Sequence, residues 1–369
     1  MRLTCDRSAL VEKLNVLARG VSVRSALPVL SGILLQAHDG LLELFSTDME
    51  LSIKATLETS VEREGDVVVP ARLFTDVLKS LPVEEVVVEA GEGSVKVSAG
   101  KGVFSLNSWV ASDFPQTSAF DTGGGFTVAR EPFVETLDKV GRAASRDETR
   151  PILTGVLMTI GGGDAKVLKM VATDSYRLAV KETPLEGGPT EDVEAIVPVK
   201  ALNEVARLAA TDGEGDIGIA VTENQALFNL GDVWVATRLI DGQFPNYRQL
   251  VPESFDHTIV VDRDEILSVA RRVSLLAQKN APLRLTFAPG ALTMRAVTQD
   301  IGQAEEELDV EFGGEEFEIG FNPLFLIDGI EGVDGERVVL KFINPLRPGL
   351  VSGEDGGFQY LIMPIRLSG

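Results

Sequence analysis

An acid, a phenol and a guanidinium lie close together in one short segment near the middle of the chain. Asp174, Tyr176 and Arg177 fall within four consecutive residues, and such a group could exchange protons with a substrate. The segment therefore supports one hypothesis, an α+β enzyme. A nucleophile with a neighbouring base would also be expected. The two histidines, His38 and His257, are instead interpreted as surface residues in a turn and a linker.

Other motifs for catalysis or cofactor binding are missing from the sequence. No cysteine–histidine cluster has the spacing of a zinc site. No glycine-rich loop has a phosphate-binding pattern, and no G-x-S-x-G turn is present. Residues 161–164 are interpreted as a hairpin turn, and residues 305–307 as a solvated acidic stretch. We therefore expect no metal, no cofactor and no catalytic residue.

Composition and charge restrict the class of protein further. The formal net charge of −22 opposes tight, static binding of nucleic acid over the whole surface. It still permits a local basic surface, because salt screens charges beyond about 8–10 Å. Cys5 is the only cysteine, so no internal disulfide can form. No long apolar run or signal peptide is evident, and we expect a cytoplasmic protein that does not enter a membrane.

The chain repeats its own sequence landmarks. Residues 28–34 return as residues 151–157, an offset of 151 − 28 = 123, and a weaker echo begins at Pro282. The Thr-Asp pair at Thr47 returns at Thr173, an offset of 173 − 47 = 126. Several matches in one order indicate repeated domains. We predict three similar domains over residues 1–122, 123–253 and 254–369.

Each domain is predicted to carry two helices on an antiparallel sheet of about eight strands, an α+β class. The first helix of each domain has an apolar face at i, i+4, i+7 spacing: Leu10/Leu14/Leu17, Phe133/Leu137/Val140 and Ile266/Ala270/Val273. Asp6, Asp262 and Asn322 are suitable N-caps. The second helices are predicted over residues 71–80, 199–209 and 323–331.

Four segments carry a resemblance to a known family: Tyr360–Leu367, Ala172–Ala179, Asp241–Arg248 and Leu27–Leu30. Together they resemble bacterial sliding clamps, the β subunit of DNA polymerase III. The resemblance implies a homodimer closed head to tail into a ring, which encircles duplex DNA without reading its sequence. It also implies a non-catalytic processivity factor whose partners are the polymerase III α subunit, the clamp loader and other proteins with a clamp-binding motif.

The same resemblance implies a pocket for a client peptide of the Q-L-x-L-F type between the second and third domains. Aliphatic side chains there would receive the client's leucine and phenylalanine, and a methionine could adapt to different peptides. The implied pocket residues are Leu153, Thr173, Ser175, Tyr176, Arg177, Leu178, Pro245, Arg248, Leu250, Asn322, Phe325, Pro348, Leu361, Ile362, Met363, Pro364, Ile365, Arg366 and Leu367.

Two further surfaces follow from the resemblance. Basic side chains near the helices are expected to face DNA: Arg24, Arg72, Lys79, Lys139, Arg142, Arg146, Lys200, Arg207, Arg271 and Arg272. Arg24 stands where the family has a DNA-contacting arginine. The helix over residues 323–331 departs from the pattern because it contains no basic residue. For the dimer contact, Phe104 and Leu106 of one chain are expected to meet Leu275 and Leu276 of another.

Two alternatives remain open at this point. A clamp paralogue that serves inhibitor resistance would carry the same motifs. The α+β enzyme that uses Asp174, Tyr176 and Arg177 would need one dominant cleft.

Overall fold

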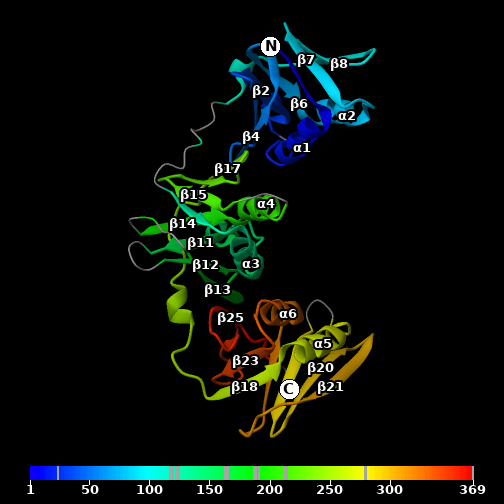
Figure 1. The fold of residues 1–369 in the computed structure, drawn as a ribbon. Helices are drawn as coiled ribbons and strands as arrows, with labels where there is room; N and C mark the ends of the chain where they lie inside the picture. The colour runs from blue at the N-terminus through cyan, green and yellow to red at the C-terminus, as the bar shows by residue number, and fades with distance from the viewer. Residues whose placement is uncertain are drawn as a thin grey trace. The chain divides into compact units, whose positions relative to one another are not determined.

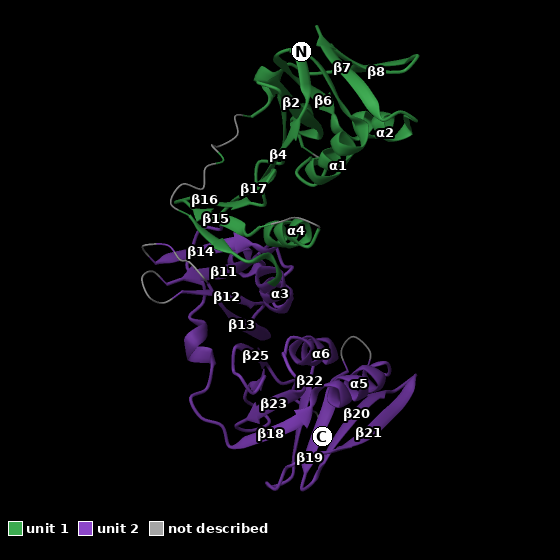
Figure 2. Ribbon diagram, in the orientation of Figure 1, with its two compact units in different colours: residues 1–131, 200–239 green, residues 132–199, 240–369 purple. Residues whose placement is uncertain are grey.

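The computed structural model describes residues 1–22, 25–115, 120, 125–161, 166–185, 189, 192–211, 215–277 and 281–367. The chain divides into two compact units (Figure 2), residues 1–131 with 200–239 and residues 132–199 with 240–369. Among the described residues, no helix has both the length and the apolar character needed to cross a membrane. The predicted boundary at residues 121–124 and most of the predicted turn at 161–164 lie outside the described residues.

The first unit contains two antiparallel sheets (Figure 1). The five-stranded sheet has the order β5 (Ser60–Arg63), β1 (Arg2–Asp6), β7 (Glu85–Gly91), β8 (Ser94–Ala99), β9 (Gly102–Asn107). The eight-stranded sheet has the order β10 (Phe126–Val128), β15 (Ile217–Val221), β16 (Gln225–Asn229), β17 (Val233–Arg238), β4 (Leu51–Glu58), β3 (Leu41–Thr47), β2 (Gly32–His38), β6 (Gly65–Pro70). Its helices are α1 (Arg7–Leu17), α2 (Ala71–Ser80) and nearly all of α4 (Val199–Ala209), with 3₁₀ turns η1 (Pro28–Ser31) and η2 (Ala111–Asp113).

The second unit is built in the same way. Its eight-stranded sheet has the order β14 (Val193–Pro198), β11 (Gly155–Ile160), β12 (Val167–Thr173), β13 (Arg177–Pro184), β25 (Phe358–Ile362), β24 (Gly349–Ser352), β23 (Arg337–Phe342), β18 (His257–Asp262). Its four-stranded sheet has the order β21 (Gly302–Asp309), β20 (Ala291–Thr298), β19 (Leu283–Ala288), β22 (Phe317–Phe321). Its helices are most of α3 (Arg130–Gly141), α5 (Arg263–Ser274) and α6 (Pro323–Glu331), with 3₁₀ turns η3 (Pro151–Thr154) and η4 (Tyr247–Leu250).

Both eight-stranded sheets join four strands of one repeat to four strands of the next. In the first unit β4 pairs with β17, and Ile53 lies opposite Val235. In the second unit β13 pairs with β25, and Leu178 lies opposite Leu361. The remaining two sheets end at β9 and β21. In the repeat, β9 corresponds to β17 and β25, and β21 corresponds to β4 and β13. Strand pairing between repeats is therefore made at two places, whereas β9 and β21 are edge strands without the corresponding partner in the described part of the chain.

The predicted helix signals are confirmed. Asp6 accepts a hydrogen bond from the backbone N–H of Ala9 at 2.7 Å, and Asp262 accepts one from Glu265 at 2.9 Å. Asn322 caps α6 in the same way through the N–H of Leu324 at 2.9 Å. All nine residues of the three predicted apolar faces are buried, and the three predicted second helices have the observed bounds.

Two interpretations need correction. His38 ends strand β2 rather than lying in a turn. His257 begins strand β18, and its ring stacks on that of Phe317 with 4.6 Å between centroids. The acidic residues 305–307 belong to β21, where Glu305 and Glu307 are exposed, as expected for a solvated stretch, and Glu306 pairs with Arg272 at 2.6 Å. This acidic stretch is therefore part of a sheet edge.

The glycine of the repeated Pro-x-Leu-x-Gly motif is explained by close approach of two strands. A Cβ at Gly32 would lie 2.5 Å from Cγ1 of Val68 and 2.9 Å from the carbonyl oxygen of Val69. A Cβ at Gly155 would lie 2.6 Å from Cγ2 of Ile196. Both glycines begin the strand after a 3₁₀ turn, β2 and β11. The motif recurs because the same tight contact recurs.

We predict that Gly32→Ala lowers the free energy of unfolding by about 1–3 kcal/mol, because the new methyl group overpacks the sheet. Urea unfolding followed by circular dichroism measures the effect. Gly91→Ala is the control, because nothing lies within 4 Å of its Cβ position. Equal stability of Gly32→Ala and the parent chain would contradict this account of the motif.

Candidate functional site

The segment that the sequence singled out forms a tight turn between β12 and β13. Oδ1 of Asp174 accepts hydrogen bonds from the backbone N–H groups of Tyr176 at 2.9 Å and Arg177 at 3.0 Å. Ser175 has a φ of 80°, in the left-handed region that favours glycine. Asp174 therefore shapes the backbone of the turn, and this role does not favour the hypothesis of an acid–base cluster.

The pairing of β13 with β25 brings the two main motifs of the predicted pocket together. Leu178 and Leu361 lie opposite each other and belong to one buried cluster with Tyr247. Beyond the strands, the backbone N–H of Met363 donates to the carbonyl oxygen of Tyr176 at 2.8 Å. Residues nearly 190 positions apart in the chain thus form one continuous surface.

Exposed apolar side chains come from the segments that flank this strand pair. Tyr176, Leu250 and Met363 were predicted pocket residues and are 63%, 51% and 47% exposed. Leu324, at the start of α6, and Leu346, shortly before β24, are also exposed, and sequence reasoning missed both. Leu324 and Leu346 each lie within two residues of a predicted pocket residue, and this closeness in the sequence was the only signal that could have identified them. Exposed apolar surface is often part of a binding site, so these side chains are candidates for one.

The other predicted pocket residues differ in exposure. Leu153, Thr173 and Ile362 are buried; Arg177, Asn322, Phe325, Pro348, Pro364, Ile365 and Leu367 are half-buried; Ser175, Pro245, Arg248 and Arg366 are exposed. Ile365 donates its backbone N–H to the carbonyl oxygen of Gly320 at 2.8 Å, which holds the C-terminal segment beside β22.

Arg177 is held by its own protein on every side. Its Nε donates to Asp174 at 3.1 Å, Nη1 donates to Asp328 and to the Tyr360 hydroxyl at 3.0 Å, and Nη2 donates to the carbonyl oxygen of Arg142. Its guanidinium also lies 4.3 Å from the ring centroid of Phe325. Arg177 therefore fixes β13 to α6 and β25 and has little capacity left for a client peptide.

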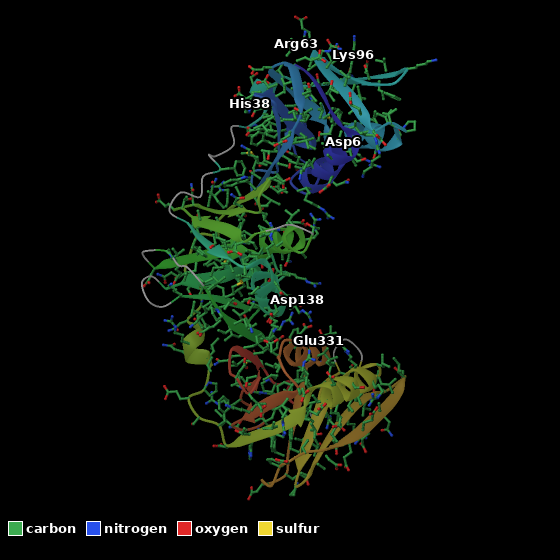
Figure 3. The ribbon with its side chains drawn as sticks, viewed as in Figure 1. Asp6, His38, Arg63, Lys96, Asp138 and Glu331 are labelled. Carbon is green, nitrogen blue, oxygen red and sulfur yellow. The ribbon has the colours of Figure 1, made fainter. Side chains whose placement is uncertain are left out.

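Acidic residues of α6 and the following loop pair with basic residues in or just after α3, in α5 and in β13. Glu331 accepts hydrogen bonds from Arg142 and from Arg271, the latter at 2.6 Å. Asp334 pairs with Lys139 and with Lys181, the latter at 2.9 Å. Asp138 adds a contact to Arg142 at 2.8 Å; Asp138 and Glu331 are labelled in Figure 3.

These contacts change the set of residues expected to face DNA. Lys139 is buried and bound to Glu135 and Asp334, so its ammonium is committed within the protein, and we remove it from the set. Arg142 and Arg271 share Glu331. Arg72, Lys79, Arg146, Lys200, Arg207 and Arg272 are exposed. Arg24 lies outside the described residues.

The four residues expected at the dimer contact also differ in exposure. Phe104 on β9 and Leu275 after α5 are 37% and 82% exposed. Leu106 is buried opposite Val95 in its own sheet, so its prediction as a contact residue is not retained. Leu276 is half-buried. Val103 and Ile301 add exposed apolar surface near the same two edges.

The pKa of the Glu331 carboxyl reflects its place between two arginines. Burial alone would raise this pKa, but hydrogen bonds and charge from Arg271 and Arg142 outweigh burial and lower it. The pKa of Asp334 is lowered in the same way by Lys139 and Lys181. A carboxylate with a lowered pKa stabilises the fold above its ordinary pKa, and this contribution is lost as the pH falls through the lower, folded value.

We predict that Glu331→Gln lowers the free energy of unfolding at pH 7 by about 1 kcal/mol, because two charged hydrogen bonds are weakened. The difference from the parent chain should shrink as the pH falls below the ordinary pKa of a glutamate carboxyl, and it should vanish once the pH has passed the lower, folded value. Thermal unfolding measured from pH 3 to pH 8 tests both statements. Glu354→Gln, in an exposed turn, should show neither effect; a difference for Glu331→Gln that is independent of pH would contradict the assignment.

Comparison with known proteins identifies the family of the chain. Models of the DNA polymerase III beta subunit match three consecutive segments: the N-terminal domain at residues 1–118, the central domain at 127–246 and the C-terminal domain at 248–366. A beta sliding clamp of Streptomyces coelicolor is 34% identical, and the alignment covers 100% of both chains.

Solved structures agree with the sequence comparison. A DNA polymerase sliding clamp from Bacillus subtilis superposes with a TM-score of 0.95 at 27% identity, over 100% of both chains. A sliding clamp from Pseudomonas aeruginosa bound to griselimycin superposes with a TM-score of 0.91 at 30% identity, also over 100% of both chains. With its three successive α+β domains, the chain belongs to the DNA polymerase III beta subunit family.

Proposed function

We propose that this chain is a processivity factor: two copies close into a ring around duplex DNA and tether a replicative polymerase and other DNA-processing proteins to it. The observation that carries this proposal is the pair of incomplete sheets. Unpaired strand edges invite pairing with another chain, and the repeat itself shows which edges correspond.

The strand order defines the missing contact. In the two complete sheets, β4 pairs with β17 and β13 pairs with β25. By the same order, β21 of one chain would pair with β9 of a second chain. Because this contact uses different surfaces on the two partners, it is head-to-tail, and such a contact gives a closed ring when its rotations complete a full turn.

The side chains at the two edges support that pairing. Phe104 on β9 and Leu275 just after α5 offer exposed apolar surface. The strand β21 carries the exposed acids Glu305 and Glu307, and Lys96 on β8 (Figure 3) is exposed next to β9. Opposite charge on the two edges would orient their encounter.

The exposed basic residues fit a loose hold on DNA. Arg72, Lys79, Arg146, Lys200, Arg207, Arg271 and Arg272 can contact phosphates, which carry no sequence information. Several of these already have acidic neighbours, such as Asp76 near Arg72 at 3.8 Å and Glu204 near Arg207 at 2.9 Å. Phosphate contacts would therefore be weak and exchangeable, as sliding requires.

The exposed apolar surface around Tyr176, Leu250 and Met363 is the proposed site for client peptides. Buried Leu178 and Leu361 form its floor. The named partners, the polymerase III α subunit and the clamp loader, and a cytoplasmic location remain predictions. An inhibitor-resistance role is not favoured by any contact, and we propose that the chain acts without catalysis.

We predict that the protein stays on circular DNA and leaves linear DNA, because a ring is released only at an end. The protein would be loaded on a nicked circular plasmid by its clamp loader and separated from unbound protein by gel filtration. Cutting the plasmid once should then release most of the bound protein. Equal release from cut and uncut plasmid would refute the ring.

A variant set links that result to the proposed edge contact. Phe104→Ala with Leu275→Ala removes contacts worth roughly 3–6 kcal/mol, so the dimer should dissociate in sedimentation analysis and retention should be lost. Leu73→Ala, an exposed leucine on α2, is the matched control and should remain dimeric. A dimeric double variant would place the contact elsewhere.

We also predict that Met363→Ala and Leu250→Ala each weaken binding of a fluorescent Q-L-x-L-F-type peptide roughly tenfold, the equivalent of about 1.4 kcal/mol. Both side chains are exposed, so folding should not change. Fluorescence anisotropy measures the affinity, and Ile301→Ala, at another exposed apolar position, is the control. Unchanged affinity in both variants would remove this surface from the proposal.

A further inference from the structure

The repeat carries a backbone hydrogen bond that marks the same place in each of its three copies. A residue just after the last strand of the repeat donates its N–H to the residue three positions before the second helix. The three donor–acceptor pairs are Trp109–Val68 at 3.0 Å, Ile240–Ile196 at 2.9 Å and Ile365–Gly320 at 2.8 Å. These bonds give a common reference point for comparing the strands at the boundaries between repeats.

From each acceptor, a row of paired residues crosses the sheet to the strand at the boundary. The rows are Val68–Leu34–Phe45–Lys54, Ile196–Leu157–Val171–Val180 and Gly320–Arg284–Arg295–Glu305. Every step in these rows is an observed strand pair. Lys54 on β4, Val180 on β13 and Glu305 on β21 therefore hold equivalent positions.

The strand on the other side of the boundary can be counted from the donor of the same hydrogen bond. At both internal boundaries, the residue opposite the end of the row stands six positions before the donor. These residues are Trp234, before Ile240 (240 − 234 = 6), and Gln359, before Ile365 (365 − 359 = 6). On β9 the corresponding residue is Val103, before Trp109 (109 − 103 = 6).

We propose that β21 of one copy and β9 of its partner pair in this register, with Glu305 opposite Val103 of the partner subunit. Because the strands are antiparallel, each step forward on β21 is matched by one step back on β9. The further pairs are Ala304 with Phe104, Gln303 with Ser105, and Glu307 with Lys101. This inference rests on the proposed function, which supplies the strand contact but leaves open which residues meet.

One face of this register gives Phe104 a partner of suitable size. Phe104 lies over Ala304, just as Tyr360 lies opposite Ala179 at the internal boundary of the second unit. Each alanine pairs in turn with an alanine of the next strand. Tyr360 is fully buried, whereas Phe104 is 37% exposed without a partner strand. Pairing with a second copy covers Phe104 in the way that Tyr360 is covered.

The other face brings opposite charges together at the end of the strand pair. Lys101 and Glu307 are both exposed, and neither has an ion pair in the part of the chain that the structure describes. Two more acids of β21 share the face of Glu307. Glu305 already lies 3.6 Å from Arg295, whereas Asp309 adds to the negative charge that Lys101 meets. Opposite charges that face each other across a strand pair stabilise it.

Cysteine cross-linking tests the register directly, because Cys5 is the only cysteine and is 5% exposed. The test variant carries Ser105→Cys and Gln303→Cys, both at exposed positions. Residues directly opposite each other have Cβ atoms about 4.5–5.5 Å apart, close enough for a disulfide after small adjustments. After mild oxidation, we expect a covalent dimer on a non-reducing gel from this variant and none from either single variant.

Two shifted pairs are the matched controls: Ser105→Cys with Glu305→Cys, and Ser105→Cys with Ile301→Cys. Each represents a slip of two residues, the smallest slip that keeps the same face of the strand inward. The predicted pair should cross-link at least tenfold faster than either shifted pair. A shifted pair that cross-links faster, or no cross-link in a protein that sedimentation shows to be dimeric, would overturn the register. A monomeric parent chain would instead overturn the proposed ring, so the two failures are distinguishable.

Charge reversal gives an independent test of the same register. Lys101→Glu and Glu307→Lys should each weaken the dimer severalfold at low salt, and the variant with both changes should recover to within about twofold of the parent chain. Lys101→Glu with Glu316→Lys has the same net charge and should not recover. If the first double variant stayed as weak as the single variants, Lys101 and Glu307 would not be partners and the register would be wrong.

Discussion

The structure depends on antiparallel strand pairing across the boundaries between successive repeats. Each repeat has only part of a sheet, and its last strand would expose a row of unpaired N–H and carbonyl groups. The contacts of β4 with β17 and of β13 with β25 satisfy those groups inside each unit. Because the backbone supplies the hydrogen bonds, the contact tolerates changes of side chain, and the boundary residues remain available for other roles.

That arrangement explains why the candidate pocket lies at a boundary. The pairing of Leu178 with Leu361 sets the floor, and the turn at Ser175 and the segment at Met363 emerge from the same end of the strand pair. Arg177 then ties this end to α6 through Asp328 and to β25 through Tyr360. The proposed binding surface is therefore held by the same contacts that hold successive repeats together, and these contacts would give it a fixed shape before a client binds.

Much of this could be predicted from the sequence because the repeat preserves local hydrogen bonds. Thr47 and Thr173 each accept a hydrogen bond from the backbone two residues later, at 3.0 and 3.2 Å, and the residues that donate, Met49 and Ser175, both have a φ of 80°. A short turn depends on neighbours in the chain, so a repeated Thr-Asp pair predicts a repeated turn. Helix caps and apolar faces are local in the same sense.

Long-range charge pairing could not be read from the sequence. Arg142 and Glu331 are 189 residues apart, and nothing in the helix pattern of α3 indicates that Lys139 turns inward to Asp334. The grouping of Lys169, Val180, Tyr247 and Gln359 around one cleft was missed for the same reason, because these residues come from β12, β13, η4 and β25. These features need the strand order first, because only the sheet determines which distant residues become neighbours.

The acidic residue at the end of α6 is explained by the way in which a ring holds DNA. A protein that holds DNA by enclosure does not need high affinity, and each additional phosphate contact would slow its movement and steepen its dependence on salt. Glu331 lies between Arg142 and Arg271 and offsets part of their charge. The absence of a basic residue from α6 is therefore compatible with the function of a ring. The helix strengthens the joint between α3, α5 and α6 while it moderates the attraction of nearby arginines for phosphate.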